Sequence, residues 1–241
     1  MDPSTPFKDI GDVFDTIPGP DDSWPGPAQL SPVNQLQQPG ISSTTTTDDY
    51  PSSIHKEAEA KRLRLKEICK PLLAEVRAAF GVKELKPLQV EAMEALYDGQ
   101  DVLFTAGTGF GKSMIFTGLG YMFPWREKPV IIIFVPIEGL GNEQVIRLND
   151  AYRKRRLEKA KKSGTSISKA IRDIAILYDH SKPEAHWLEK IAAGDYRYVY
   201  ISPERAAKQE TRNKLWLNED FKGMIKLVAV DEAHLVTDWY A

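Results

Sequence analysis

The sequence predicts an α/β protein with a doubly wound, mostly parallel β-sheet and helices on both faces. Three observations support this fold class. Short apolar runs alternate with helical patterns from about residue 56 onward, which is typical of a parallel sheet. A glycine-rich loop follows one apolar run at residues 105–113, and an acidic pair, Asp231 and Glu232, follows another. Because ligands bind at the carboxyl ends of strands in such sheets, we expect both features at one edge.

Composition divides the chain into an N-terminal tail and one domain. Of the 241 residues, 42% are hydrophobic, which can supply the core of a single large domain. Residues 1–55 contain eight Asp and one Lys, and nine of the sixteen prolines lie before residue 54. With few aromatic residues and no apolar periodicity, this segment is predicted to be a disordered acidic tail. The domain is therefore expected over residues 56–241.

Cysteine usage and hydropathy exclude several classes of protein. Cys69 is the only cysteine, which excludes an internal disulfide and any zinc site built from several cysteines. It also suits a reducing, intracellular compartment. No apolar run approaches the roughly 20 residues that a membrane span needs, so no membrane association is expected.

Two helices are predicted ahead of the glycine-rich loop. The first begins near residue 56, contains Pro71, where a kink is possible, and ends before Gly81. Its apolar positions recur at helical spacing and are Leu65, Ile68, Leu72, Leu73, Val76 and Phe80. The second is expected to begin at Pro87 and to end before Gly99. Its predicted apolar face consists of Leu88, Met93 and Leu96.

Five strands are predicted from short apolar runs. They cover residues 102–104, 130–135, 174–178, 198–201 and 227–230. Helices are expected from about residue 140, over residues 184–193 and near residues 215–221. The run at 130–135 is almost continuously β-branched, as in strands that are buried on both faces.

The loop at residues 105–113 has the composition of a phosphate-binding loop. It lies between a predicted strand and a predicted helix and ends in Gly-Lys-Ser. Glycines allow backbone N–H groups to converge on an anion, and the following helix N-terminus favours negative charge. Lys112 is expected to reach the β- and γ-phosphates of ATP, and Ser113 to ligate Mg²⁺. The predicted nucleotide contacts are Ala106, Gly107, Thr108, Gly109, Phe110, Gly111, Lys112 and Ser113, with Ala106 standing where the strict pattern has glycine.

The acidic pair at the end of the last predicted strand completes the chemistry that a phosphate-loop enzyme needs. Asp231 is expected to hold Mg²⁺, directly or through water. Glu232 is expected to accept a proton from the attacking water. An Asp-Glu pair after a strand is common by itself, so the interpretation depends on its combination with the phosphate loop.

Several motifs together resemble one family. Asp231, Glu232, Ala233 and His234, with the phosphate loop, are similar to the motifs of superfamily 2 helicases. Residues 80–89 resemble the adenine-recognition motif of RecQ-type DNA helicases. Residues 136–145 and 200–205 resemble two further RecQ segments, and Trp239 stands in the place of a tryptophan in the RecQ aromatic-rich loop. The resemblance covers about residues 75–241 and implies the RecA-like ATP-binding domain of a RecQ-like, DEAH-type helicase.

The resemblance also implies roles for individual residues. Gln89 would hydrogen-bond the adenine edge with Lys86 beside the base, although a glutamine on a helix surface is the simpler interpretation. His234 would link the ATP site to the DNA-binding elements. The implied contacts with a nucleic-acid strand are Pro136, Gln144, Ser202, Pro203, Glu204, Arg205 and Trp239. Trp239 would stack near a base, or it could be an ordinary core tryptophan.

Some positions depart from the family pattern. Phe110 replaces a small residue and could crowd the phosphate loop. Asp238 and Tyr240 replace the Gln and Gly around the tryptophan, and Asn142 replaces a position that is often basic. The basic stretch at residues 153–162 belongs to a longer connection than is usual. This stretch could contact phosphates, act as a nuclear import signal, or be a solvated helix face.

The expected function is that of the ATP-binding lobe of a 3′-to-5′ DNA helicase, with DNA as partner and a nuclear role in DNA repair or recombination. An RNA helicase, or another nucleic-acid-stimulated ATPase of the same superfamily, is the first alternative. The sequence ends about ten residues after the acidic motif, ahead of the family's second RecA-like domain and its arginine finger. We therefore expect an incomplete sheet and binding of ATP and nucleic acid without unwinding. A non-catalytic fragment is the second alternative.

Overall fold

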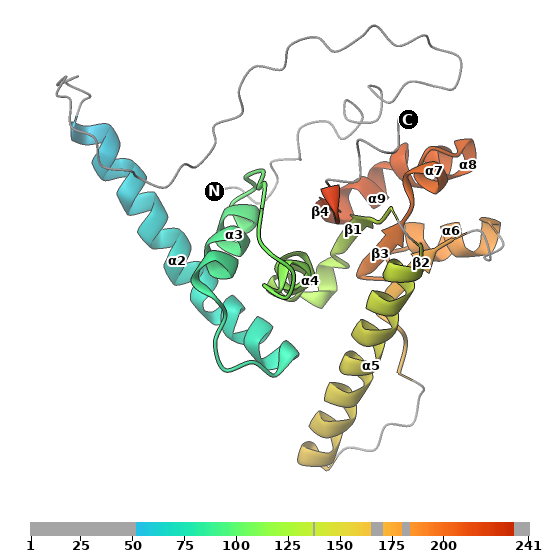
Figure 1. Cartoon of the computed structure of the whole chain (residues 1–241), viewed down its shortest axis with the longest axis horizontal. Coiled ribbons are helices and arrows are strands. Elements are labelled where there is room, and N and C mark those ends of the chain that lie inside the picture. Colours follow the sequence, from blue (N-terminus) through green and yellow to red (C-terminus); the bar gives the residue numbers. More distant parts are fainter. Residues whose placement is uncertain (1–51, 137, 165–170, 180–183, 234–241) are drawn as a thin grey trace, which may run out of the picture.

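The computed structural model describes residues 52–136, 138–164, 171–179 and 184–233 (Figure 1). The predicted tail therefore lies outside the described residues, apart from its last few positions. The helices are α2 (Ser52–Phe80), α3 (Pro87–Tyr97), α4 (Lys112–Met122), α5 (Glu138–Ser163), α6 (Glu184–Ala192), α7 (Pro203–Ala206), α8 (Gln209–Thr211) and α9 (Glu219–Met224). A short 3-10 helix, η1 (Trp125–Glu127), and a π-helix, η2 (Arg212–Trp216), complete the helical elements of this part of the chain.

A parallel β-sheet forms the centre of the fold. Its strands are β1 (Val130–Phe134), β2 (Ala175–Tyr178), β3 (Tyr198–Ile201) and β4 (Ile225–Val230), in the order β2-β3-β1-β4. The three pairings between these strands are all parallel, and Ile132 of β1 lies between Val199 of β3 and Val228 of β4. Parallel strands need crossover connections, which the intervening helices provide. The strand order confirms the predicted α/β class.

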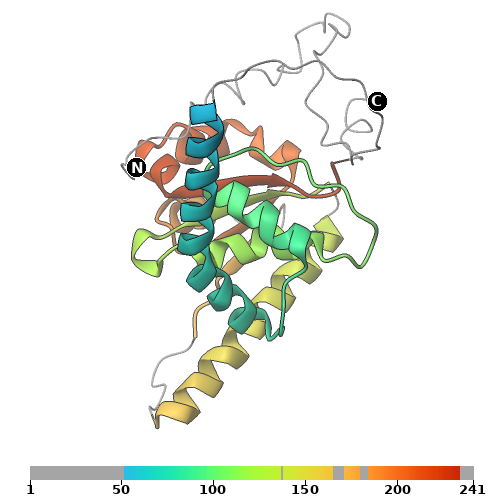
Figure 2. The same cartoon turned by 90° about the vertical axis from the view of Figure 1, so that its left-hand side faces the viewer.

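Alternate side chains of each strand enter two separate cores. Ile131 and Ile133 face the core that α2, α3, α4 and α5 cover, whereas Val130 and Ile132 face the core beneath α6, η2 and α9. Figure 2 shows α2 crossing outermost, over α3 and α4. Because both faces are covered, each strand must be apolar on both sides, which explains the continuous run in β1.

The predicted strand at residues 102–104 is wrong. These residues have no regular secondary structure, and Leu103 is 82% exposed. Val102 and Phe104 still pack against the core on the α4 side. A strand forms only beside a partner, and among the described residues β4 pairs with β1 alone, so no partner lies next to residues 102–104. The sheet in this part of the chain therefore has four strands in place of the expected five.

The buried faces of the first two helices contain most of the predicted residues, and the exceptions are Ile68 and Leu88, which are exposed. Cys69 is completely buried whereas Ile68 is 48% exposed, so the buried stripe of α2 passes through Cys69, Leu73 and Val76. In α3 the buried residues are Gln89, Ala92 and Met93, and Leu88 lies outside this stripe. α2 continues through Pro71. No helix in the described ranges is both long and apolar enough to cross a membrane.

Two adjacent side chains at the start of β3, Arg197 and Tyr198, hold the helix that follows the phosphate loop. The guanidinium of Arg197, just before β3, donates to the carbonyl oxygens of Gly120 and Phe123 at 2.5 and 3.4 Å. It also lies 3.5 Å from the ring centre of Trp125. The hydroxyl of Tyr198 donates to the Thr117 carbonyl. Burial lowers the pKa of Arg197 from its usual range, but the aromatic rings and carbonyl oxygens around it still favour the cation.

The Tyr198 side chain lies so close to α4 that only glycine fits at position 120, and replacement of Gly120 should destabilise the protein. A Cβ atom at Gly120 would lie 2.5 Å from the Tyr198 hydroxyl oxygen. We expect Gly120→Ala to lower the free energy of unfolding by about 1–3 kcal/mol, as overpacking does in cores. Thermal unfolding followed by circular dichroism measures the effect. Gly223→Ala in α9 is the matched control, because nothing lies within 4 Å of the added methyl group. Equal melting temperatures for the two variants would contradict the prediction.

Candidate nucleotide site

The phosphate loop turns between residues 105 and 111 and continues into α4. Gly109 and Gly111 adopt φ angles of +76° and +93°, which residues with a Cβ rarely adopt. Gly111 is the residue before the first turn of α4, which begins at Lys112. α4 is anchored by buried apolar residues, including Ile115 and Leu119. The loop therefore presents the N-terminus of a fixed helix, where backbone N–H groups are available to an anion.

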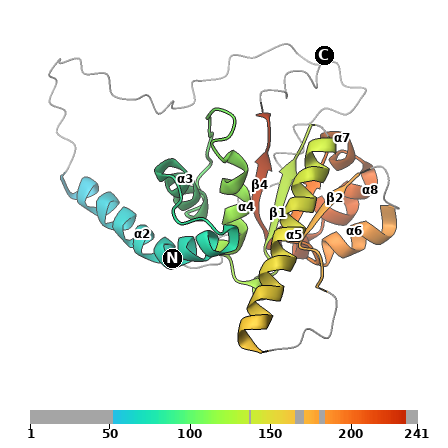
Figure 3. The same cartoon turned by 60° about the horizontal axis from the view of Figure 1, so that its bottom comes forward.

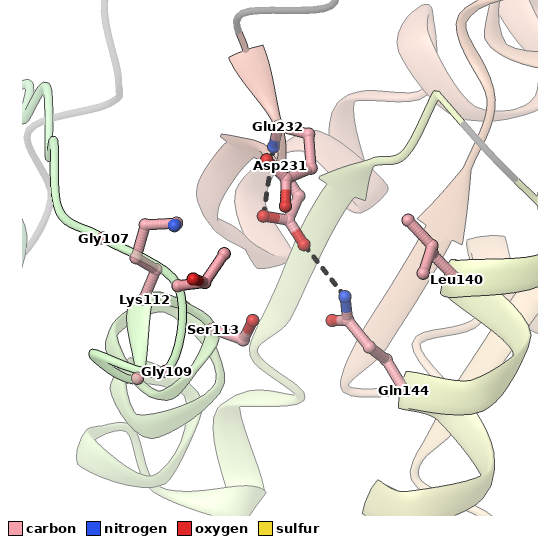
Figure 4. A pocket seen from close by; sticks show the side chains of 10 residues that line it. Gly107, Gly109, Lys112, Ser113, Leu140, Gln144, Asp231 and Glu232 are labelled. Carbon is pink, nitrogen blue, oxygen red and sulfur yellow. Dashed lines mark hydrogen bonds between the residues drawn. The ribbon is translucent and has the colours of Figure 1, made fainter.

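The structure brings the loop and the acidic pair to one pocket, as predicted for the carboxyl edge of the sheet. The pocket has a volume of about 310 Å³. Its lining consists of Gly107, Thr108, Gly109, Gly111, Lys112, Ser113, Leu140, Gln144, Asp231 and Glu232. Figure 4 shows Lys112 and Ser113 on one side, with Asp231 and Glu232 facing them from the end of β4. A cation, a hydroxyl and two carboxylates thus surround one small cavity.

Asp231 is held by hydrogen bonds at both carboxylate oxygens. Oδ2 accepts from Nε2 of Gln144 at 2.9 Å, and Oδ1 accepts from the backbone N–H of Glu232 at 3.1 Å. Its own N–H donates to the Phe134 carbonyl at 3.0 Å, which extends the β1–β4 pairing by one residue. Asp231 is only 9% exposed. Its position is therefore fixed before any ligand binds.

Glu232 occupies an uncommon backbone conformation at the rim of the pocket. Its φ angle is +52°, in the left-handed region that non-glycine residues rarely adopt. Such a conformation persists when the surrounding structure imposes it, and it is found preferentially at functional sites. The chain therefore turns directly after β4, where the two carboxylates meet the pocket.

A buried tyrosine lies beneath the acidic pair. Burial raises the pKa of Tyr200, and the Asp231 carboxylate raises it further. The hydroxyl is therefore neutral at physiological pH.

Gln89 and Lys86 support the phosphate loop from α3. Gln89 is 3% exposed, so the interpretation of this residue as a surface glutamine is wrong. Its Nε2 donates to the carbonyl oxygens of Phe110 and Gly111 at 3.2 and 3.1 Å, and its Oε1 accepts from the N–H of Lys86 at 2.9 Å. The ammonium of Lys86 donates to the Phe110 carbonyl at 2.8 Å. Both residues thus lie against the loop, and their contact with adenine stays a prediction.

Phe110 points away from the pocket. Its ring lies 4.2 Å below the Lys86 ammonium and 5.6 Å from the ring of Phe104. Phe110 is absent from the pocket lining, so the expected crowding of the phosphate loop does not occur in this conformation. The ammonium of Lys112 meanwhile donates to the Ala106 carbonyl at 3.0 Å, within its own loop.

Part of the predicted nucleic-acid contact set lies elsewhere than expected. Gln144 faces the nucleotide pocket and binds Asp231. Ser202 is buried and caps the N-terminus of α7, where its hydroxyl oxygen accepts a hydrogen bond from the N–H of Arg205. Arg205 is 2% exposed, with its guanidinium 4.5 Å from the ring centre of Tyr178. Both side chains are thus buried in this structure, and their contact with a nucleic-acid strand stays a prediction.

The remaining predicted contacts are exposed or lie outside the described residues. Glu204 is exposed, and Pro136 and Pro203 are half-buried. His234 and Trp239 lie outside the described residues, and so do Asp238 and Tyr240.

Sequence reasoning missed the part that Gln144 has in the nucleotide pocket. α5 begins directly after β1, so its first two turns lie at the carboxyl edge of the sheet beside Asp231. The sequence did contain a signal: Gln144 is a polar residue about two turns into a helix that follows a central strand. Polar residues are otherwise expected on the exposed side of such a helix.

Comparisons with known proteins agree with this geometry. Residues 86–241 match the family model described as DEAD/DEAH box helicase. The chain is 25% identical over 169 residues to a Caenorhabditis elegans protein named ATP-dependent DNA helicase Q1, an alignment that covers 68% of this chain and 23% of that protein. It is 26% identical over 161 residues to a Bacillus subtilis protein named ATP-dependent DNA helicase RecS, covering 66% and 27% of the two chains.

A further relative carries a different substrate in its name. A protein of Acanthamoeba polyphaga mimivirus, named ATP-dependent RNA helicase, is 26% identical over 192 residues, covering 79% of this chain and 28% of that protein. The chain thus spans about a quarter of the length of these relatives.

Proposed function

Because the chain belongs to the DEAD/DEAH box helicase family, we propose that it is the ATP-binding lobe of a RecQ-like, nucleic-acid-dependent helicase that acts on DNA. One observation carries the proposal: the phosphate loop and the acidic pair line the same pocket. The names of the relatives Q1 and RecS support DNA as the substrate. The activity of the whole protein, including unwinding and its 3′-to-5′ polarity, is part of the proposal.

The residues in the pocket suit Mg²⁺ and a nucleoside triphosphate. The Ser113 hydroxyl and the Asp231 carboxylate offer the oxygen ligands that Mg²⁺ prefers. When bound, Mg²⁺ supplies neutralisation of charge on the β- and γ-phosphates. Lys112 would exchange its bond to the Ala106 carbonyl for the phosphates, while Gln144 keeps Asp231 oriented. Glu232, at the rim, would accept the proton of the attacking water.

The adenine preference tests the proposed site. We expect this chain to bind a fluorescent ATP analogue about tenfold more tightly than the GTP counterpart, since one or two hydrogen bonds distinguish the bases. Gln89→Ala should remove the preference, because it removes both the donor and the acceptor of the amide. Since Gln89 also donates to the Phe110 and Gly111 carbonyls, the variant should weaken binding of both nucleotides, and the ratio of the two affinities is the readout. Fluorescence titration in the presence of Mg²⁺ measures both affinities.

A control separates base recognition from general damage. Gln100→Ala is suitable, because the exposed Gln100 amide donates to the Asp98 carboxylate, and Gln100 is not among the residues that line the pocket. The variant should keep the wild-type preference. Equal affinities of the wild-type chain for the two nucleotides would contradict the adenine role of Gln89.

RNA is the second candidate substrate, which the name of the viral relative favours. A competition assay distinguishes the two: unlabelled DNA and RNA strands are each titrated against a labelled single strand that is bound to this chain in the presence of the ATP analogue. Displacement by DNA at lower concentration supports the proposal, whereas displacement by RNA at lower concentration supports the second candidate.

A further inference from the structure

The outer half of α5 extends beyond the domain. The helix contains 26 residues, so it is about 39 Å long at about 1.5 Å per residue. The strands contain 4 to 6 residues and span only about 13–20 Å. α5 begins at the nucleotide pocket with Leu140 and Gln144 and passes the opposite edge of the sheet (Figure 3). Its last three turns therefore have little of the domain to pack against.

This outer half is strongly basic. Between residues 153 and 162 there are seven basic residues and one acidic residue, a net charge of 7 − 1 = +6. The fold uses two of the cations: Arg153 bonds Asp150 and Asp173, and Arg155 bonds Glu75 at 3.2 Å. The other five are exposed, and no hydrogen bond or ion pair is found for them within the described ranges. They are Lys154, Arg156, Lys159, Lys161 and Lys162.

An exposed aromatic side chain lies at the base of this basic helix. Trp125 is 49% exposed, and its ring centre is 5.8 Å from that of Tyr152 on α5. Arg156 and Lys159 follow Tyr152 at four and seven residues, so they lie on the same side of the helix one and two turns further out. Trp125, Arg156 and Lys159 thus form a continuous strip.

From these observations we infer that the outer half of α5 is a second nucleic-acid contact, which binds the phosphodiester backbone. We call it the basic arm, defined by Lys154, Arg156, Lys159, Lys161 and Lys162, with Trp125 at its base. It lies at the edge of the sheet opposite to the nucleotide pocket, so it holds a part of the nucleic acid remote from the ATP site. The choice of partner rests on the proposed function.

The chemistry of the arm favours a polyanion. Five exposed cations within nine residues repel one another along the helix, and phosphates on either side offset that repulsion. Arg197 covers one face of the Trp125 ring, and the exposed part of the side chain offers an unpaired base a stacking surface. A membrane surface would need an apolar stripe, but Leu157 is the one large apolar side chain exposed on this part of the helix. Contacts between these cations and backbone phosphates are independent of base sequence.

The salt dependence of binding tests the arm. The test variant replaces Lys154, Arg156, Lys159, Lys161 and Lys162 with glutamine in the 241-residue chain. Fluorescence anisotropy with a labelled oligodeoxythymidine and with a labelled duplex gives affinities between about 50 and 200 mM salt. If each of the five cations contacts one phosphate, we expect the magnitude of the slope of log affinity against log salt to fall by about 3.5–4.5, since each lost phosphate contact removes about 0.7–0.9. Affinity at low salt should fall about 100-fold.

A matched variant controls for net charge. It replaces five exposed lysines outside the arm with glutamine, namely Lys56, Lys66, Lys70, Lys83 and Lys214. Glutamine and lysine have similar helix propensity, so neither variant should alter the circular dichroism spectrum. Equal slopes for the two variants would overturn the inference and leave the arm as a solvated face or an import signal.

The tryptophan is tested in the same assay. Trp125→Ala should weaken binding of the single strand about tenfold with an unchanged salt slope, because stacking releases no counterions. An unchanged affinity of this variant would contradict the role of Trp125 in the nucleic-acid contact.

Titration with the ATP analogue separates this inference from the proposed function: the variant of the basic arm should bind nucleotide as tightly as the wild-type chain. If the wild-type chain binds nucleic acid through the basic arm but binds no ATP, the proposed function is wrong and the inference about the basic arm is still supported.

Discussion

Replacing Glu232 with glutamine should slow ATP hydrolysis by about 10²–10⁴-fold while leaving nucleotide affinity unchanged. Glu232 lies at the rim of the pocket, and its carboxylate is the remaining base once Asp231 is occupied by Gln144 and Mg²⁺. Glutamine has nearly the same shape but cannot accept a proton from water. The measurement is a single-turnover assay with the protein in excess over radiolabelled ATP and with single-stranded DNA present, because slow turnover is visible under these conditions.

Glu67→Gln serves as the control for this substitution, because Glu67 is exposed on α2 and is not among the residues that line the pocket. It should hydrolyse ATP at the wild-type rate. Hydrolysis by Glu232→Gln at the wild-type rate would show that another group accepts the proton. Absence of hydrolysis in the wild-type chain, despite tight binding, would instead support the non-catalytic alternative.

Replacing Lys112 with alanine should weaken binding of Mg-ATP by roughly 30- to 150-fold, which corresponds to about 2–3 kcal/mol for charge-assisted hydrogen bonds. Lys112 is the one cation in the pocket lining, and its ammonium now contacts only a carbonyl of its own loop within the described structure. Without it, no positive side chain would face the phosphates. Titration with a fluorescent ATP analogue measures the change.

Lys128→Ala is the matched control. The ammonium of Lys128 donates to the Ala193 carbonyl at 3.0 Å, so this variant also loses one bond from an ammonium to a backbone carbonyl. It lies away from the pocket and should retain wild-type affinity. If Lys112→Ala binds the analogue as tightly as Lys128→Ala does, the assignment of the phosphate loop is incorrect.

The nucleotide pocket could be predicted because its parts are local motifs with a known place in a parallel sheet. The phosphate loop ends in Gly111, Lys112 and Ser113, and its conformation follows from adjacent residues. Asp231 follows a strand that pairs with β1, so the sheet carries it to the same edge. The side chains that contact these motifs were less predictable, as Gln144 shows, because partners far apart in sequence leave no periodic signal.

Periodicity also failed where the buried and exposed sides of an element depend on its neighbours. Ile68 and Cys69 are equally plausible core residues in sequence, and only the packing of α2 on α4 decides in favour of Cys69. Ser202 and Arg205 belong to a motif that resembles a segment expected to contact a nucleic-acid strand. In the structure their hydrogen bond caps the N-terminus of α7. Burial is a property of the assembled fold, so a motif cannot report it.

The amino-acid sequence by itself determined the α/β class, the four strands of the sheet and the position of the loop and the acidic pair at one edge of it, because these depend on hydrophobic periodicity and on residue types at fixed spacing. Only the tertiary structure decided that residues 102–104 form no strand, because a strand requires a partner beside it. It likewise decided that Gln89 supports the phosphate loop from beneath and that the outer half of α5 leaves the domain, because long-range packing sets both.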